Sequence, residues 1–244
     1  MNKFYLAALV AGLSSMGAQA DTIGLFAGIS GWNAGAKGDV QSGPESIDVE
    51  NELGLDDEFS PMAYVAFEHP VPLLPNLRMQ YTELSHSGSG SLSKIFDDVS
   101  FSGDVATDLD LTHIDFIAYW RLLDNVVNLD LGLQARVFDG EVTIRQTSGT
   151  TVESTTAIDD VVPLIYGGVA VDLPLTGLSA GATLAGMKYD GNQLLDVNAR
   201  INYEVAVVGV ELGWRELSLD LDDVSDIDAD VSISGPYLGV NVHF

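Results

Sequence analysis

Charged side chains recur at alternate positions of several short apolar segments, where a period of two puts them on one face of a strand. In residues 128–137, for example, Asp130, Gln134 and Arg136 alternate with leucine, alanine and valine. Guanidinium and carboxylate groups in a confined space should pair, because an unpaired buried charge is costly. The set predicted to share one interior face is Arg78, Asp115, Arg121, Asp130, Gln134, Arg136, Asp196, Arg200, Glu211 and Arg215.

Such a set has two interpretations. The first is an ion-pair network that plugs and stiffens a narrow lumen. The second is a narrow aqueous pore in which the same groups set a preference for ions or small solutes. The first is favoured, since side chains just fill a barrel of eight strands and ten strands add only a little room.

Carboxylates also cluster in residues 220–230, where Asp222, Asp226 and Asp228 stand close together. Because Ca²⁺ takes several hard oxygen ligands, a calcium site in this acidic loop is one hypothesis. The run lacks the glycine and the distal glutamate of an EF-hand loop, so solvated negative loops are the simpler interpretation. We therefore predict no cofactor, with calcium at the acidic loops as the alternative.

An outer-membrane hydrolase with its site at the rim is a third possibility. It would need a catalytic base within hydrogen-bond reach of its partner. No nucleophile motif surrounds the serines, and spacing alone does not bring a catalytic set together, so we predict no catalytic residues and no enzymatic activity. The side chains considered for this role are Ser85, His86, Ser87, Asp108, Asp110 and His113.

Short strands of alternating hydrophobicity must position all of these groups. No segment of the mature chain offers the roughly 20 consecutive apolar residues that a membrane helix needs. The pattern predicts an all-β fold, a transmembrane antiparallel up-and-down β-barrel of 10 strands, or eight if two were miscounted. The second and sixth strands are apolar on both faces, so their facing stays open. The strands are expected near residues 22–32, 59–69, 77–84, 113–121, 128–137, 161–171, 178–189, 195–202, 208–215 and 235–244.

The connections after even-numbered strands differ in length from those after odd-numbered strands. Those after the even-numbered strands are short, whereas four of the other five are long and acidic, covering about 33–58, 85–107, 140–160 and 220–230. Short periplasmic turns and long extracellular loops are typical of membrane barrels. A soluble β-sandwich would show the same alternation, but the loop parity and the closing strand favour the barrel.

In three strands, the alternation of apolar residues changes face near the expected membrane rim. Leu109 and Leu111 are out of step with Ile114 and Phe116, Leu217 is out of step with Trp214, and Ile233 is out of step with Leu238. A β-bulge at each rim would produce such a flip.

The two ends of the chain indicate its location. Residues 1–20 have a basic start, a short apolar stretch and a small-x-small triplet ending at Ala20, as in a cleaved signal peptide. Residues 21–244 then form one barrel domain in the cell outer membrane. The closing strand resembles the terminal signal read by the outer-membrane assembly machinery, carried here by Tyr237, Gly239, Val242 and Phe244.

The composition restricts the partners. Removing the one lysine of the signal peptide from the 10 basic residues leaves 9 against 36 acidic ones, a net charge of −27. Such a charge argues against nucleic acid as a partner. The expected partners are outer-membrane lipid, lipopolysaccharide and the assembly machinery, with the chain itself a monomer. The expected function is a structural or surface-interaction role, and the sequence names no substrate or ligand.

Five stretches carry a family resemblance: DTIGLFAG, SIDVENELGLDDE, PLLPNLRMQYTEL, LDLDDVSDIDAD and GPYLGVNVHF. Together they resemble a family of small, uncharacterised outer-membrane β-barrel proteins of Gram-negative bacteria. The resemblance spans the mature chain and implies the location and the barrel fold. It supplies no substrate and no functional residues.

Overall fold

The computed structural model describes residues 23–42, 45–71, 73–97, 99–224 and 227–244. The predicted signal peptide, residues 1–20, lies outside this range. All secondary-structure elements of the described residues are strands. Over the described residues, no helix is long and apolar enough to cross a membrane.

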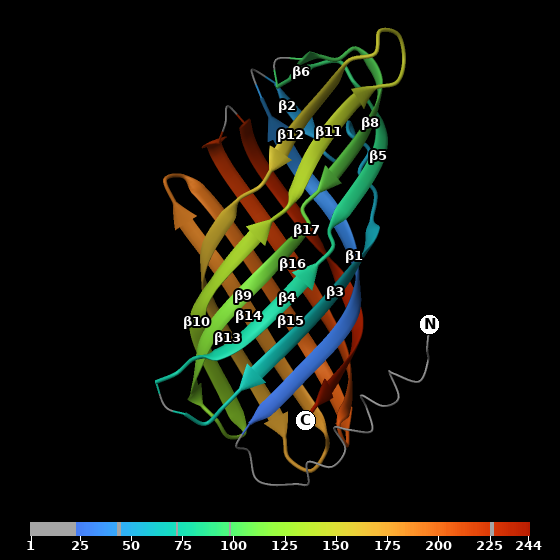
Figure 1. Ribbon diagram of the computed structural model, residues 1–244. Helices are drawn as coiled ribbons and strands as arrows, with labels where there is room; N and C mark the ends of the chain where they lie inside the picture. The colour runs from blue at the N-terminus through green and yellow to red at the C-terminus, as the bar shows by residue number, and fades with distance from the viewer. Residues whose placement is uncertain (1–22, 43–44, 72, 98, 225–226) are drawn as a thin grey trace, which may run out of the picture.

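Ten antiparallel strands form a closed barrel, in which β17 pairs with both β16 and β1 (Figure 1). The predicted barrel and its count of ten are therefore confirmed. Asp190 and Gly191, at the connection between the eighth and seventh strands, both have positive φ (49° and 87°), as the tightest hairpins require. In chain order the barrel strands are β1 (Gly24–Gln41), β3 (Glu58–Glu68), β4 (Asn76–Thr82), β9 (His113–Leu123), β10 (Val127–Phe138), β13 (Val161–Leu173), β14 (Leu178–Tyr189), β15 (Asn192–Val205), β16 (Val208–Val224) and β17 (Ile227–His243).

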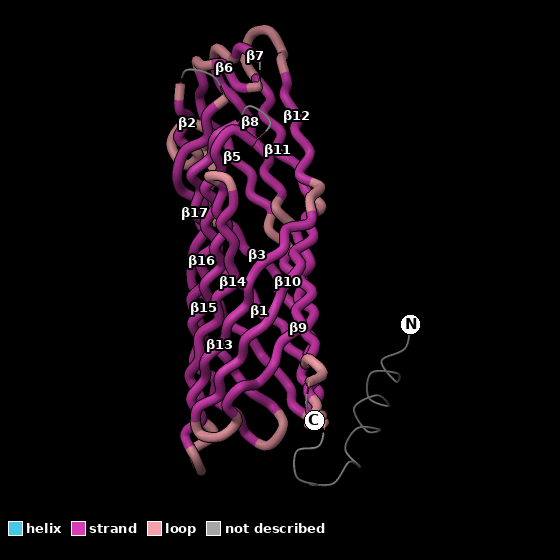
Figure 2. Tube along the Cα trace, turned by 90° about the vertical axis from the view of Figure 1, so that its left-hand side faces the viewer, coloured by secondary structure: helices cyan, strands magenta, loops and turns pink. Residues whose placement is uncertain are grey.

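Seven further strands stand at one end of the barrel, and we call them the outer extension. They are β2 (Ser46–Asp48), β5 (Ser85–Leu92), β6 (Ile95–Phe96), β7 (Val99–Ser100), β8 (Gly103–Asp110), β11 (Gly140–Gln146) and β12 (Glu153–Ile158). Four of them form a sheet in the order β12-β11-β8-β5. Figure 2 shows this extension at the top, with the short turns and the C-terminus at the opposite end, which we call the inner end.

The extension corrects the prediction that these segments are long loops. In β5 the residues Ser85, Ser87, Ser89 and Ser91 alternate with His86, Gly88, Gly90 and Leu92, and all four serines are exposed. Small polar residues hid this period of two from a reading based on hydrophobicity.

The barrel wall is apolar on its outside. Because all backbone groups of a closed barrel pair between strands, none is left exposed to lipid. The outward side chains form the apolar band that a bilayer requires. In β3, Phe59, Val65 and Phe67 face outward, and in β13, Val161, Ile165 and Val169 do, which answers the open question of facing. Further outward side chains are Leu77, Met79, Ile114, Phe116, Trp120, Leu129, Leu131, Leu133, Leu212, Trp214, Leu238 and Val240.

The predicted β-bulges are wrong for β16 and β17. The third change of face, between Leu111 and Ile114, falls at a break between two strands, since β8 ends at Asp110 and β9 begins at His113. The register of β16 on β17 runs without a shift from Val208 to Leu221. Inward positions of β16 simply change from Glu211 and Arg215 to Leu217, which has 0% exposure. The apolar phase flips because the interior becomes apolar where the strands leave the membrane, while the backbone stays regular.

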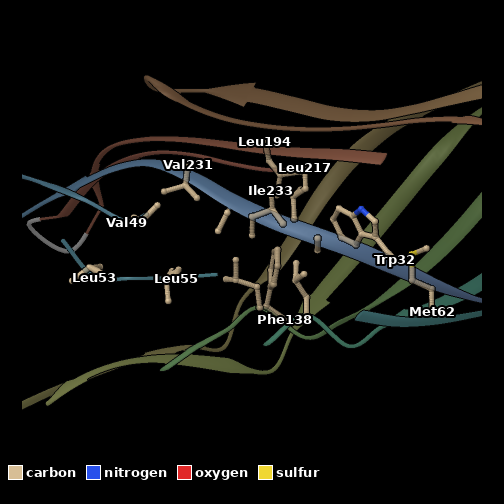
Figure 3. Packing of buried hydrophobic residues seen from close by; sticks show 14 of the residues in the cluster. Trp32, Val49, Leu53, Leu55, Met62, Phe138, Leu194, Leu217, Val231 and Ile233 are labelled. Atoms are coloured by element: carbon tan, nitrogen blue, oxygen red, sulfur yellow. The ribbon is translucent and has the colours of Figure 1, made fainter. Parts of the chain in front are cut away.

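The interior of the outer end is a packed apolar core, which we call the outer core. Figure 3 shows Leu217, Val231 and Ile233 on one side of it, with Leu53, Leu55 and Phe138 on the other. The segment that carries Leu53 and Leu55 lies directly on β5: a Cβ at Gly88 would stand 2.3 Å from the carbonyl oxygen of Gly54. The outer core comprises Ile47, Val49, Leu53, Leu55, Leu84, Leu92, Phe101, Val105, Leu111, Phe138, Ile144, Leu217, Val231 and Ile233.

Candidate functional site: the lumen

A buried ion-pair network crosses the lumen directly below the outer core. Arg136 on β10 donates to both Asp115 oxygens, through Nε at 2.7 Å and Nη2 at 3.0 Å. The same Nη2 donates to Asp196 Oδ2 on β15 at 2.6 Å. Arg215 on β16 donates to both oxygens of Asp196, through Nε at 3.1 Å and Nη2 at 2.6 Å. Two arginines thus alternate with two aspartates, and their formal charges cancel.

The network reaches across the barrel to the strands opposite β16. Arg215 Nη1 donates to Thr82 Oγ1 on β4 at 2.9 Å. Its Nη2 lies 3.3 Å from His113 Nε2 on β9. Because His113 Nδ1 donates to the Leu111 carbonyl at 2.7 Å, its Nε2 is free to accept from the guanidinium. Strands that are not neighbours in the wall are therefore joined through the lumen.

Trp32 covers the network from the side of β1. Its ring centroid lies 5.0 Å from Arg215 Cζ, a cation–π contact. The indole Nε1 donates to the Gly235 carbonyl of β17 at 3.1 Å, so the ring is fixed to the wall. Trp32 has 0% exposure and Arg215 has 1%.

A polar cavity fills the lumen on the inner side of the network. Its volume is about 770 Å³, and residues at the short turns, including Asp124, Gly177 and Glu204, mark its mouth. Between it and the network the space shrinks to about 40 Å³, room for only a few water molecules. Arg136 borders this smaller space, and its buried Nη1 has no hydrogen-bond partner among the described residues. The lumen therefore narrows from a wet inner cavity to a close-packed network.

A second ion-pair cluster lies in the wall of the inner cavity. Arg121 forms two 2.7 Å hydrogen bonds to Glu68 and one of 3.0 Å from Nε to Asp130 Oδ1. The hydroxyl of Tyr119 donates to Glu68 Oε1 at 2.6 Å. This cluster carries one more negative than positive charge.

Three of the four remaining predicted members, Arg78, Arg200 and Glu211, also line the inner cavity. Arg78 donates to Gln80 Oε1 at 3.0 Å and lies over the ring of Tyr64, 4.1 Å from its centroid. Arg200 and Glu211 face the same space. Gln134 instead joins the central network, donating to Asp115 Oδ1 at 2.8 Å. The ten predicted residues are thus divided between two levels of the lumen.

Several contributors to the lumen went unnoticed in the sequence. Glu68 lies on β3, whose facing could not be decided because both faces of that strand are largely apolar. The even positions Ser60, Tyr64 and Glu68 include polar groups, whereas Phe59 and Phe67 are apolar. That parity could have identified the inner face. Trp32 stood at the predicted end of the first strand, which in fact continues to Gln41.

The residues considered for hydrolysis lie at the base of the outer extension and do not form a catalytic arrangement. Ser85 and Ser87 are on the exposed face of β5, whereas His86 is on the buried face, with Nε2 2.9 Å from the Ala34 carbonyl oxygen. Ser87 Oγ donates to Glu58 at 3.4 Å. Ser85 and Ser87 pair in register with Asp110 and Asp108 of β8. His113 belongs to the central network.

Two of the residues considered for calcium, Asp222 on β16 and Asp228 on β17, lie near the described ends of these strands. Asp222 and Asp228 are exposed, and Asp226 falls outside the described residues. Within the described part of the chain, no group of three or more histidines and carboxylates is placed to hold a metal ion. The calcium site stays a prediction.

The proposed assembly signal also has a place in the barrel wall. Tyr237 points inward and donates to Asn198 Oδ1 at 2.9 Å. Gly239 lets β1 approach, since a Cβ there would lie 2.7 Å from that of Ser30. Phe244 exchanges two backbone hydrogen bonds of 2.9 Å with Leu25. Recognition of Tyr237, Gly239, Val242 and Phe244 by assembly machinery stays a prediction.

No protein-family model matches the chain, and no curated protein matches it. Among solved structures, the translocator domain of the autotransporter NalP from Neisseria meningitidis is 10% identical, with 98% of this chain and 94% of that chain covered and a TM-score of 0.49. Ail of Yersinia pestis, in complex with the heparin analogue sucrose octasulfate, is 11% identical, with 92% and 100% covered and a TM-score of 0.36. Neisserial surface protein A is 15% identical, with 90% and 97% covered and a TM-score of 0.36. These likenesses are too distant to transfer a function, so the fold assignment rests on the strand pairing and the apolar exterior.

Proposed function

We propose that this chain is a non-conducting, non-enzymatic outer-membrane barrel that holds its outer extension at the cell surface in a structural or surface-interaction role. The observation that carries the proposal is the central network with the outer core above it. Asp115, Arg136 and Arg215 each have 1% exposure, and Asp196 has 7%.

The physical argument for a closed lumen has two parts. An ion that crosses the network would have to displace guanidinium–carboxylate hydrogen bonds at 2.6–3.1 Å, and charge-assisted bonds of this kind are the strong ones. Beyond them it would meet the outer core, where hydration is lost, and hydrophobic constrictions close channels by dewetting. A narrow pore, the alternative function, would require both barriers to open.

The membrane assignment supports a surface role. The apolar exterior of the barrel suits lipid, and outer-membrane barrels place short turns in the periplasm and long connections outside. By that rule the outer extension faces the exterior, beside lipopolysaccharide. Its fixed sheet, of the order β12-β11-β8-β5, offers a partner a surface that loops would not.

Single-channel recording on refolded protein tests the closed lumen. We expect no discrete conductance steps in a planar bilayer in which an open porin, refolded in parallel, conducts. Reproducible steps from the unaltered chain would overturn the proposal in favour of the pore.

A pair of epitope insertions tests the orientation. One tag is placed after Gly149, between β11 and β12, and the other after Thr176, in the turn between β13 and β14. Antibody added to intact cells should label the first tag only, and permeabilised cells should show both. Labelling of the second tag alone would reverse the orientation and remove the surface role.

A further inference from the structure

Two of the five inward-facing arginines have no carboxylate partner among the described residues. Arg121, Arg136 and Arg215 all form ion pairs. Arg78 has only Gln80 as a hydrogen-bond partner, and its Nε is buried without one. Arg200 makes no hydrogen bond or ion pair within the part of the chain that the structure describes. The two therefore differ from every other arginine in the lumen.

Arg78 and Arg200 share one region of the inner cavity. They come from β4 and β15, strands far apart in the wall, and both line the 770 Å³ space and the 40 Å³ space beyond it. The charges of both arginines act on Tyr64 and on Tyr166. These two tyrosines line the cavity, and their hydroxyls make no hydrogen bond to a described residue. Four side chains with unused donors thus surround one space.

The local charge is unbalanced. Glu211 acts on Arg200, and both Glu211 and Glu204 act on Tyr64, but among the described residues neither carboxylate forms an ion pair with Arg78 or Arg200. The wide part of the inner cavity is lined by more carboxylates than guanidiniums. At its narrow end the balance is reversed, because Arg78, Arg136, Arg200 and Arg215 border the 40 Å³ space against only Asp115 and Asp196, an excess of two positive charges. A guanidinium removed from bulk water without a counter-charge is costly, so the space favours an anion.

We propose that Arg78 and Arg200 bind one small oxoanion, a carboxylate or a phosphate group, that enters through the inner mouth. The guanidinium is planar and presents paired N–H donors that match carboxylate and phosphate oxygens. The hydroxyls of Tyr64 and Tyr166 would supply further donors. The cavity volume lies within the range usual for small-molecule sites. This site does not depend on whether the lumen conducts, because it lies on the inner side of the network.

Binding of inorganic phosphate and of acetate to the refolded protein in neutral detergent tests the site. The direct readouts are equilibrium dialysis with labelled ligand and the side-chain Nε–Hε NMR signals of Arg78 and Arg200, at constant ionic strength with chloride as the reference ion. We expect saturable binding of one anion per chain and saturable movement of both signals. Comparison of the two ions distinguishes a phosphate site from a carboxylate site.

Substitutions identify the residues involved. Arg78→Gln and Arg200→Gln should each weaken binding at least tenfold, whereas Arg145→Gln, on the exposed face of the outer extension, should leave it unchanged. Arg200→Lys, which keeps the charge and loses the planar fork, should fall between wild type and Arg200→Gln. Each variant is first checked for the folded barrel's altered mobility on an unheated gel. The absence of saturable binding by both ions, or signal movement no greater than with chloride, would overturn the proposal.

Discussion

The membrane-spanning part of the barrel and the outer extension place their apolar side chains on opposite faces of the strands. In the membrane part, Leu212 and Trp214 face out, whereas Glu211 and Arg215 face in. In the extension, serines face out and the leucines of the outer core face in. The same strand, β16, belongs to both parts, and its backbone pairing does not change. The solvent around the strand decides which face is apolar.

This difference sets the source of stability in each part. The extension is held by burial of apolar area away from water, as in a soluble protein. Inside the membrane part, hydrogen-bonded charges join strands across the lumen, and they are stable only as a complete set. Substitutions at matched positions should separate the two contributions.

The largest effect is expected from Asp196→Asn, which leaves Arg215 without a carboxylate. Breaking a buried ion pair on one side costs about 3–5 kcal/mol, which reversible urea unfolding in lipid vesicles would measure. Glu153→Gln, which removes the exposed partner of Arg145, should have little effect, because water screens an exposed ion pair. Similar losses in the two variants would mean that the network adds no more than a surface pair.

Within the membrane part, charge balance should restore some of that loss. The double variant Asp196→Asn with Arg215→Met removes one charge of each sign. It should be less destabilised than the sum of the two single variants, because contacting residues are not additive. A strictly additive result would contradict a coupled network.

An intermediate effect is expected from two leucines on one strand. Leu217→Ala leaves a cavity in the outer core and should cost about 2–5 kcal/mol. Leu212→Ala should cost less by the same unfolding measurement, because lipid tails fill the space and no cavity remains. Equal costs would show that the interior at Leu217 is as adaptable as lipid.

The smallest effect is expected at the tip of the extension, where Glu52 accepts from Lys94 Nζ at 2.6 Å. This bond, with one from the backbone N–H of Asp48, holds the pKa of Glu52 below its ordinary value. A lowered carboxylate pKa stabilises the fold above the unfolded value, about 4.3, and the gain is lost as the pH falls through the lower folded value.

Hydrogen exchange around Asp48 would detect this dependence. Amide protection should decline below about pH 4, by no more than about 1 kcal/mol. The decline should be absent in Glu52→Gln and unaltered in Glu50→Gln, a change at an exposed neighbour. A decline that persists in Glu52→Gln would assign the pH dependence to other carboxylates.

The sequence predicts the barrel where one face of a strand is uniformly apolar. In β10 the alternation of leucines with Asp130, Gln134 and Arg136 marks both the strand and its inner face. Alternation of apolar and polar residues gives no signal where both faces of a strand are similar in polarity. Both faces of β3 are largely apolar, which hid Glu68, and in β5 serine alternates with glycine.

The ion-pair partners across the lumen cannot be predicted from the alternation within a single strand. Asp196 accepts from Arg136 and Arg215, whereas Arg200, four residues further along the same face of β15, pairs with no carboxylate among the described residues. Both outcomes depend on which side chains of non-neighbouring strands reach the same height in the lumen. Period-two patterning places a residue inside but does not give its height relative to other strands.

The unbroken pairing of β16 and β17 also determines how the protein would carry a mechanical load. The two strands remain in register from the inner end of the barrel into the outer extension, and β1 follows β17 from Phe26 to Gln41. Along this side there is no linker at which the extension could swing. A force applied to the tip along the strand axis would load many backbone hydrogen bonds in shear at once. The outer extension should therefore move as one rigid body with the barrel in the bilayer.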